Sequence, residues 1–118
     1  MIPETGSPEE VEYIWDLMSK RGSLPGRLHR LEYSLSCPNR PTAEFVAQYL
    51  EHRAGFSSAP PSPSVSHDGH EYWDLQLISG EGHLSLAFLR QSTATVRAVT
   101  RTFGCHLYAW GKYSEGAA

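Results

Sequence analysis

The chain has few cysteines, no long apolar run and no strong excess of charge. Cys37 and Cys105 are the only cysteines among 118 residues, which excludes a disulfide framework and gives no closely spaced pair for a metal. No apolar stretch approaches the roughly 20 residues that cross a bilayer. The net charge is −3, and an acidic chain neutralises phosphates poorly, so nucleic acid is a weak candidate partner.

What is present suits one modest folded domain spanning residues 1–118. A hydrophobic fraction of 40% supplies material for one core rather than two. Residues 1–5 lack the basic and apolar regions of a signal peptide, so we expect a cytoplasmic protein. We expect both cysteines to be buried, inert thiols in a reducing compartment.

Two helices are expected in the first half of the chain. Ser7, Pro8 and Glu10 form the pattern of a capping box, and the apolar spacing that follows predicts a helix at 7–22 that Gly22 ends. A second helix opens at 39–42 and ends at Gly55. Between them, residues 31–37 alternate apolar and polar side chains, which predicts a strand with one buried face.

A stretch rich in proline and serine, residues 57–66, separates the two halves. Its composition does not suit a central strand, so we expect an exposed, partly extended loop over 57–70. Asp68-Gly69 is the turn signal within it.

The second half predicts two or three strands and a helix. Residues 73–77 alternate as a strand, 80–82 form a tight connection, and 84–88 fit a further strand that completes a hairpin. Residues 84–90 fit the start of a longer helix as an alternative. A helix with Ser92 as its cap ends at Gly104, and the aromatic run 105–113 is expected to be central to the sheet.

This order of elements predicts an α+β fold of ferredoxin-like type. Residues 28–113 would form a βαββαβ antiparallel sheet with two helices on one face, and the helix at 7–22 would be an addition. A sheet of this kind can also bind single-stranded RNA on exposed rings or sense small ligands as a homodimer. The basic strand that RNA readers carry is absent from the sequence.

No set of residues predicts catalysis, a cofactor or a metal site. His67 and His70 stand in the expected loop without a second spaced pair, so we interpret them as surface residues. Cys105 and His106 are adjacent on an expected strand and point to opposite faces, so they form no nucleophile–base pair. We therefore predict that the protein is not an enzyme.

Residues 108–115 read Tyr-Ala-Trp-Gly-Lys-Tyr-Ser-Glu. This run is similar to the Tyr-Asp-Gly-Trp-Gly terminus of the RraB family, bacterial proteins that inhibit ribonuclease E, with the Asp-Gly step replaced. The likeness covers about Ser7 to Glu115. Its other parts are the helix at 9–21 before Gly22-Ser23, the Leu31-Glu32-Tyr33 strand, the helix ending Ala54-Gly55-Phe56, and the Asp68-Gly69 turn before 73–77.

This resemblance implies a non-catalytic, protein-binding regulator of RNA degradation that acts by direct contact with an endoribonuclease. We expect a monomer or a weak homo-oligomer. Aromatic residues dominate interface hot spots, so Tyr108 and Tyr113 are the expected partner contacts. Trp110 is expected to be a ring fixed in the core, and Gly111 to lie where the backbone turns or approaches another segment.

Overall fold

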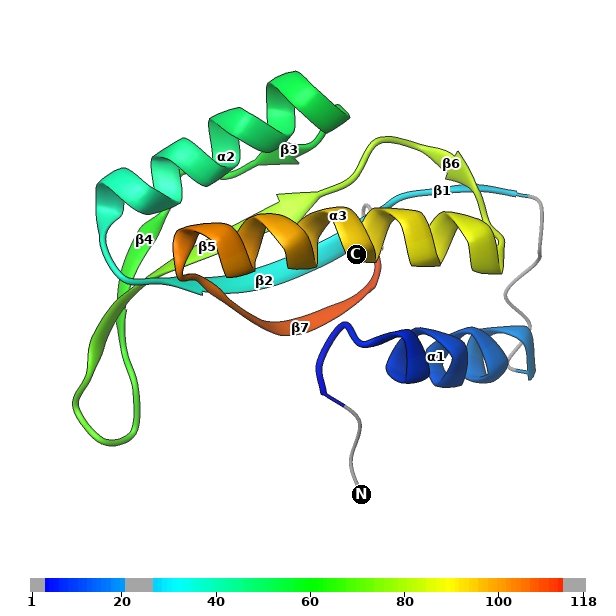
Figure 1. Cartoon of the computed structure of the whole chain (residues 1–118), viewed down its shortest axis with the longest axis horizontal. Helices are drawn as coiled ribbons and strands as arrows, with labels where there is room; N and C mark the ends of the chain where they lie inside the picture. The colour runs from blue at the N-terminus through cyan, green and yellow to red at the C-terminus, as the bar shows by residue number, and fades with distance from the viewer. Residues whose placement is uncertain (1–3, 21–26, 114–118) are drawn as a thin grey trace, which may run out of the picture.

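The computed structural model describes residues 4–20 and 27–113, which form an α+β fold. Among them, α1 (Pro8–Lys20), α2 (Arg40–Ala54) and α3 (Leu86–Phe103) pack with a five-stranded antiparallel sheet. Figure 1 shows α3 crossing the sheet, with α1 and α2 on either side of it. The strands are β1 (Leu28–His29), β2 (Leu31–Cys37), β3 (Ser57–Ser58), β4 (Ser62–Val65), β5 (Glu71–Ile78), β6 (Gly82–His83) and β7 (His106–Lys112).

Strand β2 lies at the centre of the sheet. The order is β3–β5–β2–β7, β4 also pairs with β5, and all pairings are antiparallel. The predicted strands at 31–37 and 73–77 are confirmed. The prediction that the aromatic run at 105–113 is central is wrong, because β7 is an edge strand. The central strand is the one whose alternate side chains are all buried, and in β2 those side chains are at most 1% exposed.

The ends of α1 and α2 follow from the expected capping residues. The Ser7 hydroxyl accepts the Glu10 N–H at 3.2 Å, and the Glu10 carboxylate accepts the Gly6 N–H at 2.8 Å. Asn39 caps α2 through the Thr42 N–H, and Gly55 ends it with a φ of 71°. The expected end of the first helix at Gly22 lies outside the described residues.

Helix α3 begins earlier than its predicted cap, so the expected strand at 84–88 is wrong. Ser85 is the true cap, because its hydroxyl accepts the Phe88 N–H at 3.0 Å. Ser92, the predicted cap, is instead buried inside the helix. The alternative of a longer helix is correct at this end, and Gly104 ends it as expected, with a φ of 70°. Residues 82–83 pair with β1 in a separate two-stranded ribbon.

The stretch rich in proline and serine is strand rather than loop over part of its length. Strands β3 and β4 lie one after the other along the outer edge of β5, where Ser58 pairs with Leu77 and Pro63 with Trp73. Proline lacks an N–H but is tolerated at an edge, where one side of the strand has no partner. The Asp68-Gly69 turn closes the β4–β5 hairpin, and the Ser66 N–H donates to the His70 carbonyl at 2.9 Å.

One hydrophobic core lies between the sheet and the helices. Tyr33 of β2 is fully buried at its centre, and its hydroxyl contacts Ser92 at 2.8 Å and Thr93 at 3.0 Å on α3. A buried hydroxyl with two partners satisfies its hydrogen-bonding needs within an apolar core. The core members are Val11, Leu31, Tyr33, Leu35, Cys37, Ala43, Val46, Leu50, Phe56, Leu75, Leu77, Leu84, Leu89, Val96, Val99 and Leu107.

Candidate partner-binding face

The residues that alternate with the buried ones form a second face of the sheet, which we call the open face. Each of its members is partly or fully exposed. Because cross-strand partners share a face, the pairing of Ser34 with Gln76 and of Ser36 with Asp74 places β2 and β5 side chains together there. The open face consists of Glu32, Ser34, Ser36, Ser57, Ser62, Ser64, Tyr72, Asp74, Gln76, Ile78, His106, Tyr108, Ala109 and Gly111.

A β-bulge in β7 brings Tyr108 onto the open face. Leu35 pairs with Leu107, but the next residue along, Ser34, pairs with Ala109, so Tyr108 is the extra residue. Leu107 is buried and Trp110 is half-buried against the core, although residues three apart in a regular strand point to opposite faces. The bulge resolves this conflict and leaves Tyr108 and Ala109 both exposed.

Hydrogen bonds hold the Tyr108 ring in place on this face. Its hydroxyl donates to Asp74 Oδ1 at 2.5 Å, and Gln76 Nε2 donates to Asp74 Oδ2 at 2.9 Å. The Ser34 hydroxyl donates to Gln76 Oε1 at 2.7 Å, so the network spans β7, β5 and β2. Partial burial and the Asp74 carboxylate raise the pKa of the Tyr108 phenol, which therefore stays a neutral donor at physiological pH.

The charge of the open face is negative. Its members include the two acids Glu32 and Asp74 and one histidine, His106, and there is no lysine or arginine among them. A phosphate backbone would be repelled by such a surface, whereas a basic protein surface would be attracted to it. The face combines a prepositioned, 43% exposed aromatic ring with two acids, which suits contact with a positively charged protein.

The two predicted contact residues lie apart. Tyr113 follows the end of β7 and is half-buried, and its backbone N–H donates to the Arg30 carbonyl at 2.9 Å. The open-face network does not include it. Five residues of extended chain cover roughly 16 Å, so Tyr108 and Tyr113 would contact different parts of a partner.

Trp110 lies at the margin of the core rather than in its interior. Its ring stacks on Tyr33, with centroids 6.0 Å apart and an angle of 12° between the planes. Its indole N–H donates to Glu10 Oε1 at 2.6 Å, which joins β7 to α1. Gly111 has no positive φ, and among the described residues nothing would lie within 4 Å of an added Cβ, so the expected turn or close approach there is wrong.

The two cysteines are neighbours, which the sequence reasoning did not foresee. Cys37 is buried as expected, but Cys105 is only half-buried. The hydrogen bond between the thiols, together with burial, raises the pKa of Cys37, and the same hydrogen bond lowers the pKa of Cys105. Cys105 is therefore the more reactive thiol, because the thiolate is the nucleophile.

We expect iodoacetamide to alkylate Cys105 about tenfold faster than Cys37 at mildly alkaline pH, because Cys105 has the lower pKa and the greater exposure. Tryptic peptides separate the two positions, so mass spectrometry over a time course measures both rates in one sample. Equal rates in the folded protein would contradict the assignment. The same experiment in denaturant, where the rates should converge, is the control.

The described residues show neither a metal site at the histidines nor a membrane-spanning helix. His67 and His70 are exposed in the β4–β5 turn, and His70 lies 3.6 Å from Asp68. Within 4–20 and 27–113, no three acidic, histidine or cysteine side chains gather as a metal site would require. No helix in the same two ranges has the length and apolar character to cross a membrane.

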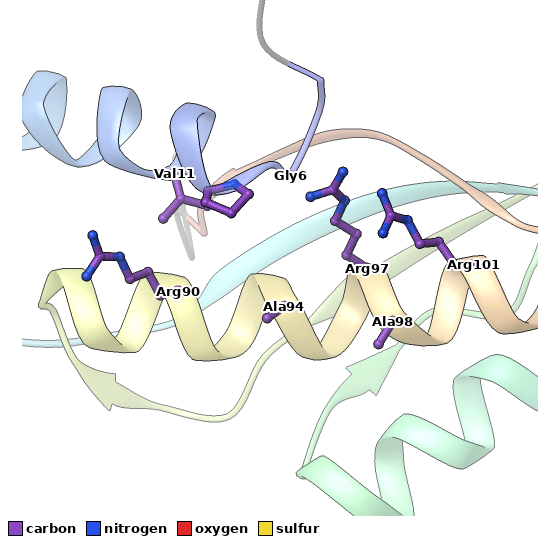
Figure 2. A pocket seen from close by; sticks show the side chains of 8 residues that line it. Gly6, Val11, Arg90, Ala94, Arg97, Ala98 and Arg101 are labelled. Atoms are coloured by element: carbon purple, nitrogen blue, oxygen red, sulfur yellow. The ribbon is translucent and has the colours of Figure 1, made fainter.

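A cleft lies between α1 and α3, and the sequence did not predict it. Figure 2 shows Val11 of α1 above α3, with Arg90 near one end of the cleft and Arg97 and Arg101 near the other. The signal in the sequence is the placement of Arg90, Ala94, Arg97, Ala98 and Arg101 along one side of a helix. The predicted helix from Ser92 to Gly104 already contained four of these residues, but nothing in the sequence indicated that α1 would lie beside them.

Comparisons with known proteins give no assignment. No protein-family model matches the chain, and no curated protein matches it either.

Proposed function

We propose that the protein is a non-catalytic regulator that binds a protein partner through the open face. The observation that carries this proposal is Tyr108, a 43% exposed ring fixed by Asp74 on an acidic sheet surface. A ring held in place before binding loses little conformational freedom on binding, and exposed tyrosines of this kind are frequent interface anchors. Glu32 and Asp74 give the surface a negative field that steers a basic partner.

The proposed partner is an RNA-degrading endoribonuclease of the ribonuclease E type, as the resemblance to the RraB family implies. Such enzymes bind RNA and present basic surfaces, which an acidic face can occupy. The regulator would act by covering part of that surface, without chemistry of its own. Tyr113, at the end of β7, is proposed as a second contact outside the open-face network.

The ferredoxin-like assignment is part of the same proposal. The strand order β7–β2–β5 followed by β3 and β4, all antiparallel, supports a βαββαβ plan in which the second strand is divided into two short pieces. Helices α2 and α3 would be the two helices of that plan, and α1 would be the addition. The acidic open face makes the RNA-binding alternative a poorer fit than a protein partner.

The test is a pull-down with tagged protein followed by titration of the purified endoribonuclease that it captures. We expect Tyr108→Ala to weaken the complex by about 2 kcal/mol, roughly thirtyfold in Kd, because a central aromatic anchor is lost. Tyr113→Ala should weaken it less. The complex should also weaken as salt rises, because charge attraction is screened.

The matched control is Tyr13→Ala, which removes a 61% exposed tyrosine from α1, outside the open face. It should leave Kd unchanged. Circular dichroism of each variant checks that the fold persists. If Tyr108→Ala binds as tightly as the wild type, the open face is not the contact surface. If RNA alone is recovered, the regulator proposal fails and the RNA-binding alternative replaces it.

A further inference from the structure

The cleft between α1 and α3 is a hollow of about 380 Å³ that lies away from Tyr108 and its network. Small ligand sites in proteins begin at roughly this volume. Pro8 and Val11 of α1 face Ala94 and Ala98 of α3 across it, so its walls are apolar. Ala94 and Ala98 are exposed rather than covered by α1, which argues against close helix packing as the reason for these small residues.

The charges around the cleft are unequal at its two ends. Arg90 pairs with Glu12, one cation with one acid. At the other end, Arg97 and Arg101 share the single carboxylate of Glu4, at 2.8 Å and 3.9 Å. Figure 2 shows these two arginines side by side on α3, beside Gly6. The Arg97 side chain is mostly covered, with 18% of it exposed, so its position beside the cleft is fixed.

The Glu4 carboxylate shows that an anionic head fits between these arginines. Glu4 is 72% exposed and stands before α1 in the chain, so its ion pair is of the exposed kind that contributes little to stability. A ligand carboxylate joined to an apolar body would replace Glu4 at the arginines and also cover the exposed Ala94 and Pro8. Glu4 itself has no apolar body to place there.

We propose that the α1–α3 cleft binds a small amphipathic carboxylate, its head at Arg97 and Arg101 and its apolar chain along Ala94 and Pro8. The head makes charge-assisted hydrogen bonds, which the planar guanidinium groups donate well. The chain removes apolar surface of both helices from water. This site is independent of the open face and of the proposed regulator function.

The probe is octanoate, added to the isotopically labelled full chain and followed by amide resonances in two-dimensional NMR. We expect saturable shifts at Gly6, Ala94 and Ala98, with no shift at the open face. Two analogues separate the contributions of head and chain. Octanamide lacks the charge and acetate lacks the chain, and each should bind at least about tenfold more weakly than octanoate.

Variants test both halves of the site. Ala94→Leu fills the cleft from an exposed position and should weaken octanoate binding about tenfold, whereas Ala87→Leu, exposed on α3 outside the cleft, should not. Arg101→Gln should weaken binding about tenfold, and Arg90→Gln should change it little, because the head is at the opposite end. Glu4→Gln should tighten binding several-fold, because it removes the competing carboxylate.

The sign of the Glu4→Gln effect is decisive, because a merely structural ion pair would leave octanoate affinity unchanged. Every substitution here is at an exposed or partly exposed position, and Ala87→Leu lies outside the cleft. Failure to fold would therefore not explain a result in which no variant changes octanoate binding. The proposal is overturned if octanoate produces no saturable shifts. Shifts that Ala94→Leu and Arg101→Gln leave unchanged, or that centre on another surface, overturn it as well.

Discussion

Trp110→Ala should lower the free energy of unfolding by about 3 kcal/mol, the lower end of the range for losing a large aromatic ring from a core. The ring is half-buried, so the loss of apolar contact is less than for a fully buried tryptophan. It covers the Tyr33 ring, and its N–H is the hydrogen bond that joins β7 to Glu10 of α1. The melting temperature should fall by about 10–15 °C for a domain of this size.

Urea unfolding followed by circular dichroism measures this change. Trp110→Phe separates the two contributions, because it keeps a ring over Tyr33 and loses only the bond to Glu10, at a cost of about 1 kcal/mol. Glu10→Gln keeps an acceptor for the indole N–H and is the milder partner variant. A loss below about 1 kcal/mol for Trp110→Ala would show that the ring adds little to the core.

The effect of Tyr33→Phe on the free energy of unfolding should depend on pH. Near neutrality it leaves the hydroxyls of Ser92 and Thr93 without their partner and should cost about 1–2 kcal/mol. Burial raises the pKa of Tyr33 to about 12, above its usual value of 10.0. The folded state therefore keeps a proton that the unfolded state loses, and the wild type loses stability as pH rises between those two values.

A difference of two pKa units corresponds to about 2.7 kcal/mol of stability, which the wild type loses as pH rises. The phenylalanine variant has no phenol to ionise and loses none of it. The variant should therefore be the less stable protein at pH 7 and the equal or more stable one near pH 12. Unfolding of both proteins at matched pH values measures the difference and cancels the titration of other groups. Parallel curves across the alkaline range would contradict the burial of an intact phenol in the core.

An element could be predicted where the local sequence pattern agreed with the environment of those residues in the folded protein. The alternation of β2 and the caps of α1 and α2 are local and strong, and they were read correctly. Residues 84–88 alternate as a strand does, but they surround Ser85, whose hydroxyl starts a helix. The alternation is accidental there, because Leu84 is buried before the helix begins and the first fully buried residue of α3 is Leu89, which is not part of the alternation.

The Pro63 strand and the Tyr108 bulge were hidden for a different reason. Proline disfavours a strand on average, but an edge position removes the penalty, and only the finished sheet shows which position is an edge. Nothing in the local sequence at Tyr108 indicates an extra residue. The bulge lets Leu107 and Trp110 both face the core, and both lie on β7, whose partner strand β2 is far away along the chain.

The candidate sites show the same division. Tyr108 was chosen as an exposed aromatic contact, and the structure places it on the open face, but its bond to Asp74 depends on strand pairing. The thiol pair of Cys37 and Cys105 and the α1–α3 cleft depend on contacts between distant segments. Residue type alone can suggest which residues belong to such a site, but it cannot predict which residues lie next to each other in the folded protein.

The central position of β2 sets the kinetics of folding. Its first residue, Leu31, pairs with Lys112 at the end of β7, so the chain must close a long loop before that side of the sheet forms. Folds that rely on such distant pairings assemble slowly, on the scale of milliseconds to seconds. Until β7 pairs with it, one side of the most deeply buried strand has unpaired backbone groups, and a newly made chain is then at its most prone to associate with its neighbours.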